Sequence, residues 1–382
     1  MKKRVFRSIC LILALLMAGS LLAACGNNQT APPAAPADPG APASPAGDGR
    51  VFTVDAAYAA GEPVTRSWTG ALNEIERRSD GRITFNHHYA GSLLTFPEIP
   101  RGMLDGVAQW AYLPSNNFPD VLPLSCRIMQ MPFMGLRDAL DSAEIMMQLM
   151  DEFPEIAEEF AQFNMVPLSA SPLWAYHLHL IDDDEVRLPQ DLAGRAINPF
   201  KPELQSMFES FNVGTSYIPP GQMFETLERA VLSGYVNTWA FAQWFGLHPF
   251  LKQHVIAFEH GFYQEFFFYV VAKDFYESLP ADLQQMWHDV FRNEQVEAFG
   301  GLRGYEFMWE ETKSFIDWQI NYARENDNLF VELTPQEAEV WKEAMAYTHE
   351  LVLNTINEQR GDQVATAIYN RAIELITQKY GA

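Results

Sequence analysis

The sequence predicts an α/β protein with mostly parallel sheets, and three observations predict this class. A strand, a helix and a second strand follow one another within about forty residues of position 50. A second series of alternating strands and helices begins near Arg195. In addition, residues 261–272 are apolar on both faces, as expected of a strand buried at the centre of a sheet.

The first series opens with a β-type run at Val51–Val54. From Arg66, large apolar residues recur at helical spacing, which predicts an amphipathic helix. Asp80-Gly81 predicts a turn, and apolar and polar residues alternate in Arg82–His87, as in a half-buried strand. Helices at 138–150 and 152–163 and a strand at 166–169 are expected next.

The second series follows a run of four acids, Asp182–Glu185. That run lacks the ligand spacing and the glycine of a calcium loop, so a solvated turn is expected in preference to a cation site. The elements expected after it are a strand at 195–198, a helix at 202–211, a strand at 215–218, a helix at 222–232, one long helical stretch at 281–326, a strand at 329–333 and a helical pair from Thr334.

The chain begins with a segment typical of export signals. Basic residues at positions 2–4 and 7 precede an apolar run at 9–18, and Leu22-Ala23-Ala24-Cys25 resembles the lipobox of bacterial lipoproteins. Residues 1–24 are thus predicted to be a lipoprotein signal peptide, with Cys25 lipidated; an ordinary secretory signal with an incidental cysteine is the alternative. Residues 25–49, rich in Pro and Ala, are expected to be a flexible tether. The protein is then extracytoplasmic, in the periplasm or on the outer face of the cytoplasmic membrane, and anchored to a membrane by lipid.

The composition limits the partners and the redox chemistry. The chain carries 49 acidic and 26 basic residues, a formal net charge of −23, which argues against nucleic acid as a partner. Once Cys10 leaves with the signal peptide and Cys25 is acylated, Cys126 is the one thiol left, so no intrachain disulfide is expected. Cys126 has no histidine near it in the sequence and is expected to be a small buried apolar residue.

Several motifs in a fixed order resemble those of the solute-binding proteins of TRAP (tripartite ATP-independent periplasmic) transporters, the DctP-like family. Each motif is weak alone, and their order over nearly all of residues 50–382 carries the resemblance. The motifs are Ser79–Ile83 with Tyr89–Leu93, Met131–Phe133, Leu188–Gly194, Phe224–Arg229 and Phe275–Gln284.

The resemblance implies a two-lobed, periplasmic-binding-protein-like α/β fold with a cleft between the lobes and a long hinge-spanning helix. The first lobe is expected to comprise residues 50–173 and about 265–300, and the second 174–264 and about 301–382. Such a receptor closes around a small organic solute and delivers it to a membrane permease driven by an ion gradient, without a cofactor and without changing the solute. This agrees with the sequence, in which the motifs of common hydrolases, phosphate loops and thiol redox sites are not found.

One position departs from the family. Members usually carry an arginine at the end of the strand after the Asp-Leu-x-Gly motif, where it binds the solute's carboxylate in a bidentate pair. Here that position is Asn198, and Arg195, three residues earlier, is expected on the opposite face of the strand. An asparagine suits a hydroxyl, an amide, an amine or another neutral polar group. The solute is therefore expected to be either a carboxylate, as is usual in the family, or a neutral or amine polar compound.

Other candidate solute contacts are aromatic, imidazole and amide side chains. By the resemblance, Asn237 holds a position that often touches solute, and Tyr89 and Glu98 are plausible cleft residues. Aromatic residues near them are able to form a cation cage, to line an apolar ligand or simply to pack in the core. The remaining candidates are Trp174, His177, His179 and Trp239.

Two alternatives to a transport receptor stay open. A protein of the same fold is able to act as a solute sensor or scaffold subunit for another membrane protein. A metal-dependent enzyme is the third hypothesis, in which His177 and His179 share one strand face and join His87 and His88 as ligands. Protonation of a histidine, which lets it bind an anion as the pH falls, is the role preferred to metal binding.

Overall fold

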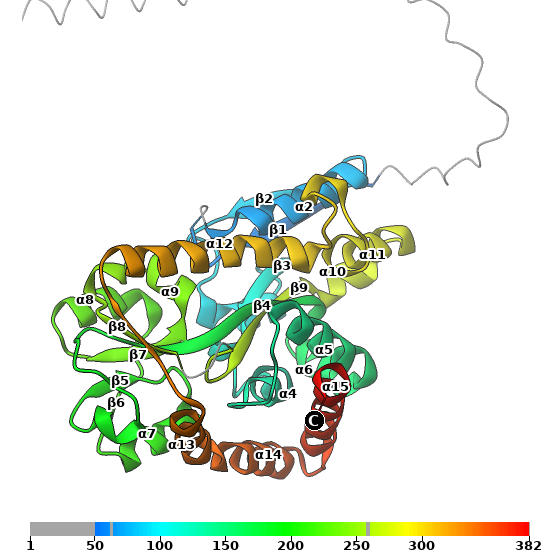
Figure 1. Cartoon of the computed structure of the whole chain (residues 1–382). Coiled ribbons are helices and arrows are strands. Elements are labelled where there is room, and N and C mark those ends of the chain that lie inside the picture. The colour runs from blue at the N-terminus through cyan, green and yellow to red at the C-terminus, as the bar shows by residue number, and fades with distance from the viewer. Residues whose placement is uncertain (1–49, 62–63, 257–259, 382) are drawn as a thin grey trace, which may run out of the picture. The chain divides into compact units, whose positions relative to one another are not determined.

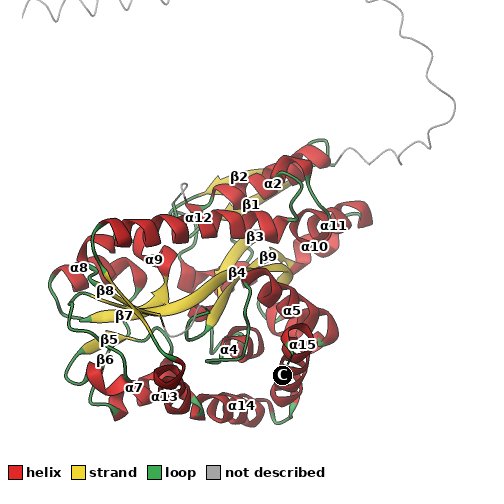
Figure 2. Cartoon of the chain, in the orientation of Figure 1, coloured by secondary structure: helices red, strands yellow, loops and turns green. Residues whose placement is uncertain are grey.

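Ten strands joined by one hydrogen-bond network organise the part of the chain that the computed structural model describes, residues 50–61, 64–256 and 260–381. The predicted signal peptide at 1–24, the lipidation site Cys25 and the tether at 25–49 lie outside the described residues. Figures 1 and 2 show the strands surrounded by helices, as the predicted α/β class requires.

The first half of the fold is a sheet of mixed direction. Strands β1, β2 and β3 are parallel, and β9 runs antiparallel to its two neighbours. In spatial order the strands are β2 (Ile83–His88), β1 (Phe52–Ala57), β3 (Trp110–Pro114), β9 (Gln264–Ala272) and the first part of β4 (Met165–Leu180).

The second half continues from the same strand β4. Its last residues pair with β7 on one side and with β8 on the other, and β5, β6 and β10 extend the arrangement in parallel. The strands are β5 (Ala196–Asn198), β6 (Gly214–Thr215), β7 (Gly234–Thr238), β8 (Gln253–Ile256) and β10 (Leu329–Glu332).

Strand β4 is the long segment that crosses from one half to the other. Its register with β9 shifts between Pro167 and Ser169 and again between Pro172 and Trp174. Proline has no N–H to give to the ladder, so a bulge is a position where a strand tolerates it. Trp174 adopts a left-handed backbone with φ of 68°, which is unfavourable for a residue with a Cβ. The bend in β4 is therefore held by the packing around it.

Strand β9 confirms the prediction of a doubly buried central strand. All nine of its residues are buried. Phe267 and Tyr269 pack in the core that contains helix α2 (Arg66–Arg78), whereas Phe266 and Phe268 pack in a second core on the other face, with α5 (Ala139–Glu152). Alternation of side chains along the strand explains this division.

Helix α12 (Gly304–Glu325) matches the expected hinge-spanning helix. It contacts α9 (Trp239–Trp244) in the second half, β4, and α2 in the first half, and Figure 1 shows it running alongside both. The remaining helices are α3 (Ile99–Leu104), α4 (Pro123–Arg127), α6 (Pro154–Ala161), α7 (Pro202–Ser210), α8 (Met223–Glu228), α10 (Lys273–Ser278), α11 (Ala281–His288), α13 (Pro335–Met345), α14 (Tyr347–Arg360) and α15 (Val364–Tyr380).

The prediction of one helical stretch at 281–326 is wrong. Helix α11 is followed by one wider helical turn at Asp289–Asn293, and the chain then reverses through Gly300 and Gly301, with φ of 71° and 84°. Helix α12 starts only at Gly304, where an added Cβ would lie 2.3 Å from the carbonyl oxygen of Val290. Glycines that permit positive φ and close packing thus interrupt a pattern that reads as helical.

Other predicted boundaries also change. The strand expected at 215–218 is the two-residue β6, because Pro219 and Pro220 follow closely. The helix expected to reach residue 232 ends at Glu228, and Ala230 adopts a φ of 50°. The expected C-terminal pair is three helices, the last two separated by Gly361 at φ of 75°.

The C-terminal arm, helices α13–α15, contacts elements of both halves. Helix α13 contacts α7, but α15 contacts α5 and the short helical turn η4 (Ile128–Gln130) of the first half. Ile368, Ala372 and Ile376 share a core with α5, which buries their apolar surface. Among the described residues, none of the helices combines the length and the apolar character needed to cross a membrane.

Candidate functional site

A buried polar cluster lies where β4, paired with the start of β9, crosses between the halves. Tyr176 on β4 and Tyr263, just before β9, stack with ring centroids 4.6 Å apart, and their backbones are hydrogen bonded. The hydroxyl of Tyr176 donates to Oε2 of Glu265 at 2.7 Å. Lys201 Nζ lies 4.9 Å from the centre of the Tyr263 ring and donates to Oε1 of Gln130 at 2.7 Å. We call these five residues the crossing cluster.

The crossing cluster joins both halves of the protein. Gln130 comes from η4 in the first half, and Lys201 immediately precedes α7 in the second half. Tyr176 lies on β4, which crosses between the halves, and Glu265 lies on β9, which pairs with β4 just before Tyr176. A ligand or a charge change at this cluster therefore acts on the contact between the halves.

The cluster contains two opposite charges out of contact with solvent. The side chains of Lys201 and Glu265 are 8% and 0% exposed, and Lys201 Nζ lies 3.6 Å from Glu265 Oε1. Burial raises the pKa of Glu265 to about 7, against the opposing effects of Lys201 and of the Tyr176 hydroxyl. A buried charge pair costs free energy unless its remaining hydrogen-bonding groups find partners.

Two polar atoms of this cluster have no hydrogen-bond partner among the described residues. They are Oε1 of Glu265 and Nε2 of Gln130. One is an acceptor and the other a donor, and both residues are at most 1% exposed. Buried polar groups are usually paired, so these two atoms are positions where a bound molecule would gain hydrogen bonds.

A cavity of about 360 Å³ adjoins the cluster. Its walls come from the loop 129–137, from residues 260–264 and from Lys342 on α13. The walls are largely apolar and include Met129, Met131 and Phe133, and Tyr263 belongs to both the cavity and the crossing cluster. A cavity of this size with apolar walls and a few polar groups is typical of small-molecule sites.

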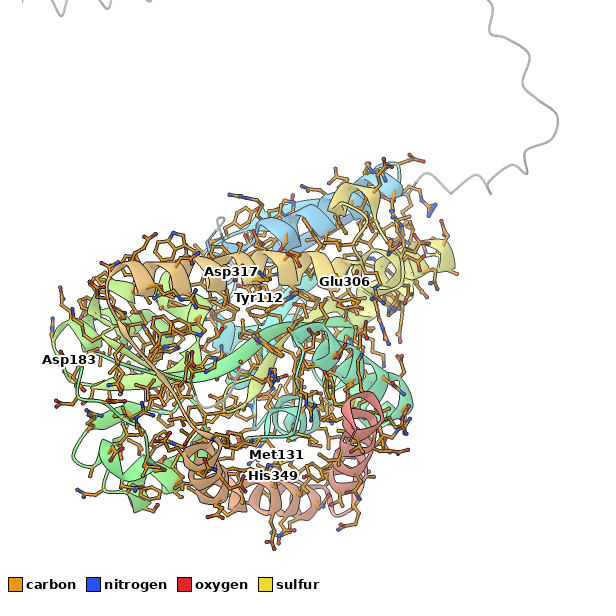
Figure 3. All side chains as sticks on the ribbon, viewed as in Figure 1. Tyr112, Met131, Asp183, Glu306, Asp317 and His349 are labelled. Atoms are coloured by element: carbon orange, nitrogen blue, oxygen red, sulfur yellow. The ribbon has the colours of Figure 1, made fainter. Side chains whose placement is uncertain are left out.

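The C-terminal arm holds one wall of the cavity in place. His349 on α14 contacts the carbonyl oxygen of Pro132 through Nε2 at 2.7 Å, and its Nδ1 lies 2.9 Å from the hydroxyl of Tyr369. A carbonyl only accepts, so Nε2 carries the proton and Nδ1 accepts from the tyrosine. Figure 3 shows His349 close to Met131, which lines the cavity.

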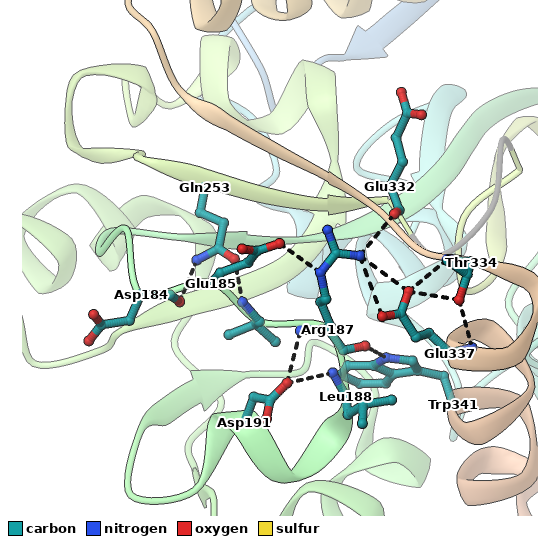
Figure 4. Close-up of polar contacts among 11 residues, drawn as sticks. Asp184, Glu185, Arg187, Leu188, Asp191, Gln253, Glu332, Thr334, Glu337 and Trp341 are labelled. Carbon is teal, nitrogen blue, oxygen red and sulfur yellow. Dashed lines mark hydrogen bonds and ion pairs between the residues drawn. The ribbon is translucent and has the colours of Figure 1, made fainter.

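Helix α13 is fastened to the loop that follows β4. Nε1 of Trp341 donates to the carbonyl oxygen of Arg187 at 2.8 Å, and the Arg187 guanidinium lies 3.2 Å from the carboxylate of Glu337. Glu337 also accepts from the N–H of Thr334 at 2.8 Å, which caps the helix (Figure 4). These contacts set the position of Lys342 at the cavity.

The acidic run is the turn that was expected. Arg195 donates to Asp182 at 2.7 Å and to the carbonyl oxygen of Asp184 at 2.9 Å. Nε2 of Gln253 donates to the same carbonyl of Asp184 at 2.9 Å (Figure 4). The guanidinium of Arg195 is therefore already bonded to the residues of this turn.

Asn198 is fully buried at the end of β5, and its side-chain amide forms hydrogen bonds with neighbouring backbone groups. Nδ2 donates to the carbonyl oxygen of Ile218 at 2.9 Å and lies 3.4 Å from the sulfur of Met223, and Oδ1 accepts from the N–H of Phe200. The position that holds an arginine in the resembling family therefore organises the turn leading to Lys201.

His177 and Asn237 lie directly opposite each other on β4 and β7. Both are buried, at 4% and 1% exposure. Nδ1 of His177 and Nδ2 of Asn237 have no hydrogen-bond partner among the described residues, whereas Oδ1 of Asn237 accepts from the N–H of Thr238. Burial lowers the pKa of His177 to about 4, so the ring is neutral near pH 7.

His179 and His254 form a buried chain of hydrogen bonds in the same half. Nε2 of His179 lies 3.0 Å from the carbonyl oxygen of Asn237, so it donates, and Nδ1 then accepts from Nδ1 of His254 at 2.8 Å. Nε2 of His254 accepts in turn from Asn328 at 3.0 Å. Burial lowers the pKa of both imidazoles, that of His254 to about 3. Trp239 packs on this pair, with centroid distances of 4.4 Å to His254 and 4.9 Å to His179.

Three other predicted residues lie apart from this group. Trp174 is half-buried at the bend of β4, 6.1 Å from the ring of His260, which lines the cavity. Tyr89 stacks on Tyr58 in the first half, with centroids 4.7 Å apart. Glu98 is exposed and accepts from the N–H and the hydroxyl of Thr95, which lowers its pKa and caps a short helical turn.

The structure separates the four histidines of the metal hypothesis. His87 contacts the hydroxyl of Tyr58 at 2.9 Å and His88 contacts Asp55 at 2.9 Å, both on the β1–β2 side of the first half. His177 and His179 lie in the second half, beyond β1, β3 and β9 in the strand order. Within the described ranges, no group of three or more His, Cys, Asp or Glu side chains is placed to hold a metal ion, so the four-histidine site is not formed.

Sequence reasoning missed the crossing cluster, although two signals were present. Glu265 is a charged residue inside an otherwise apolar run, and a buried charge needs a partner. Lys201 stands between a strand and the proline that opens a helix. Cys126, by contrast, is buried as expected, and burial raises the pKa of its thiol.

Comparison with known proteins gives one family and many related structures. Residues 57–356 match the model of the bacterial extracellular solute-binding proteins, family 7. A comparison with curated proteins returns no match.

Among solved structures, a TRAP solute-binding protein of Rhodoferax ferrireducens with copurified benzoate aligns with a TM-score of 0.72 at 17% identity, over 87% of this chain and 100% of that one. A marine metagenome TRAP protein specific for aromatic acids gives 0.71 at 16% identity, over 86% and 99% of the two chains. An extracytoplasmic receptor of Bordetella pertussis that binds pyroglutamic acid gives 0.67 at 15% identity, over 85% and 99%. At these identities the structures show a shared two-lobed fold.

Proposed function

The chain belongs to the bacterial extracellular solute-binding proteins of family 7, and from this premise we propose that it captures a small organic solute and delivers it to the permease of a TRAP transporter. The observation that carries the proposal is the crossing cluster, in which Gln130 from one half meets Lys201 from the other beside a cavity of about 360 Å³. A solute that binds both halves favours the closed arrangement by its extra affinity for it.

We propose that the solute contacts extend from the crossing cluster to the crossing strands. His177 and Asn237 remain candidate contacts, because each has an unpartnered polar atom within the described structure. Asn198 is proposed to act on the solute indirectly, through the turn that carries Lys201. Related proteins bind benzoate, other aromatic acids and pyroglutamic acid, and Lys201 supplies a cation in place of the arginine missing at position 198.

We propose that the protein releases the solute chemically unchanged. This agrees with a site that binds the solute between the two halves. We also propose that Cys25 is lipidated and anchors the receptor at the outer side of a membrane, close to its permease. Residues 25–49 would then let the folded part reach the permease.

The test is a thermal-shift screen of the purified protein against acids, amino acids, amines and polyols. A solute that binds only the native state raises the melting temperature, and the rise grows with solute concentration. The stabilising solute is then recovered and analysed by mass spectrometry, and its uptake is measured in vesicles containing the candidate permease. A folded protein stabilised by none of these classes, or one that converts the solute into a product, would contradict the proposal.

A further inference from the structure

The crossing cluster presents two charges of opposite sign at one place. Lys201 and Glu265 are 3.6 Å apart, and each has a further polar partner, Gln130 and Tyr176 respectively. A solute with a single negative charge would gain from Lys201 but be repelled by Glu265. A solute with a single positive charge would be attracted by Glu265 but repelled by Lys201. The charge pair is best matched by a molecule that carries both charges.

The two atoms without a hydrogen bond are also one acceptor and one donor, as the charge pair is one anion and one cation. Oε1 of Glu265 is an acceptor without a hydrogen bond, its ion-pair partner Lys201 Nζ lying 3.6 Å away, and Nε2 of Gln130 is a donor without a hydrogen bond. An ammonium group would satisfy the first, and a carboxylate would satisfy the second while also facing Lys201. The rings of Tyr176 and Tyr263 line the same place, and aromatic rings also attract a cation.

The cavity provides room for an apolar body beside Tyr263, the member of the crossing cluster that lines it. Met131 borders both the cavity and the crevice beside Gln130 and Lys201, and Tyr263 borders both the cavity and the cluster. A methionine side chain is unbranched and adapts its shape easily, so this shared wall is able to move when a solute enters. Met129 and Phe133 add to its apolar lining, and the polar residues Arg137, Gln264 and Lys342 also border it.

We propose that the solute is a zwitterion with an apolar side chain, such as an apolar or aromatic α-amino acid. Its ammonium group binds Glu265, its carboxylate binds Lys201 and Gln130, and its side chain occupies the methionine-lined cavity. The inference rests on the proposed receptor function and narrows its solute class.

The test compares a zwitterion with its two singly charged analogues on the purified full chain. Calorimetric titrations use L-phenylalanine, 3-phenylpropanoate, which lacks the ammonium group, and 2-phenylethylamine, which lacks the carboxylate; L-leucine and L-methionine extend the series. Each analogue lacks the group that would bind one of the two buried residues and is repelled by the like charge of that residue, so the zwitterion is expected to bind roughly 100-fold more tightly than either analogue. Equal affinity for 3-phenylpropanoate and L-phenylalanine would overturn the inference.

Two substitutions separate recognition of charge from general damage. Glu265→Gln is expected to weaken L-phenylalanine binding at least roughly 10-fold while 3-phenylpropanoate binding stays equal or improves. Lys201→Met should also weaken L-phenylalanine binding at least roughly 10-fold, whereas the affinity for 2-phenylethylamine should not fall. Lys273→Met, on α10 and outside both the cavity lining and the crossing cluster, is the matched control and keeps the wild-type preference for the zwitterion.

The outcomes distinguish this inference from the proposed function. If amino acids fail to bind while another solute class stabilises the protein, the zwitterion inference is wrong and the receptor function stands. If no solute class binds the folded protein, the receptor function fails as well. Should either variant not fold, the analogue series on the unmodified protein still decides the inference.

Discussion

The buried imidazole of His254 should make the folded protein sensitive to acid, and His254→Gln tests this. Burial lowers the pKa of His254 from its usual 6.5 to about 3. In the unfolded chain the ring takes up a proton below pH 6.5, whereas in the folded protein it stays neutral. The unfolded state thus binds more protons between these two values, so this contribution to stability is complete above pH 6.5 and is lost as the pH falls toward 3.

The size of the effect follows from the shift. Each pH unit below 6.5 costs about 1.4 kcal/mol for one such group, so at pH 5 the loss due to His254 is about 2 kcal/mol. The variant loses the hydrogen bonds to His179 and Asn328 and is less stable at pH 8, by about 1–3 kcal/mol. The difference between wild type and variant should then shrink by about 2 kcal/mol from pH 8 to pH 5.

The assay is urea unfolding at several pH values, followed by tryptophan fluorescence and by circular dichroism. Contributions from titrating groups that do not contact His254, such as Glu265, are common to both proteins and cancel in the difference, whereas His179 contacts His254 and loses its repulsion in the variant. Phe330→Leu is the matched control, because Phe330 packs against the same ring at 5.4 Å without titrating, and its cost should be the same at every pH. Parallel profiles for wild type and His254→Gln would refute the reasoning.

Three further substitutions test the packing around the site. Gly234→Ala places a Cβ 2.2 Å from the carbonyl oxygen of His179, so we expect a loss of more than about 3 kcal/mol and a poor soluble yield; a melting temperature close to wild type would contradict this. Trp341→Phe removes the hydrogen bond to Arg187 and also leaves space in place of a fully buried ring, so it should lower the free energy of unfolding in urea by about 2–3 kcal/mol; an unchanged unfolding midpoint would contradict this. Asn198→Ala leaves the carbonyl oxygen of Ile218 and the N–H of Phe200 without their side-chain partner, and a fall in stability of about 1–3 kcal/mol is expected by calorimetry; an unchanged melting temperature would mean that the asparagine is dispensable to the fold.

Local pattern predicted the elements whose identity depends on nearby residues. The helix from Arg66 and the strand at Arg82–His87 occur as expected, because their apolar spacing reports which face is buried. The doubly buried strand β9 was predicted from its composition for the same reason. The motif order also led to the correct family.

Prediction failed where the outcome depends on contacts between distant segments. The helical stretch at 281–326 contains a reversal set by glycine backbone angles and by the bridge between Val296 and Leu302. Strands β3, β7 and β8 were not predicted. Such short strands form because a neighbouring strand offers hydrogen bonds, which a local pattern does not report.

The sequence by itself determined the α/β class, the buried faces of the main elements and the family, since these follow from residue type and spacing along the chain. Only the tertiary structure decided which polar groups meet: Gln130 with Lys201, Tyr176 with Glu265, and His179 with His254. Each of these pairs joins segments about 70 residues or more apart in the chain. The physical reason is that periodicity specifies which face of an element is buried, whereas the partner of that face, and with it the charge and shape of the site, is set by how the elements pack.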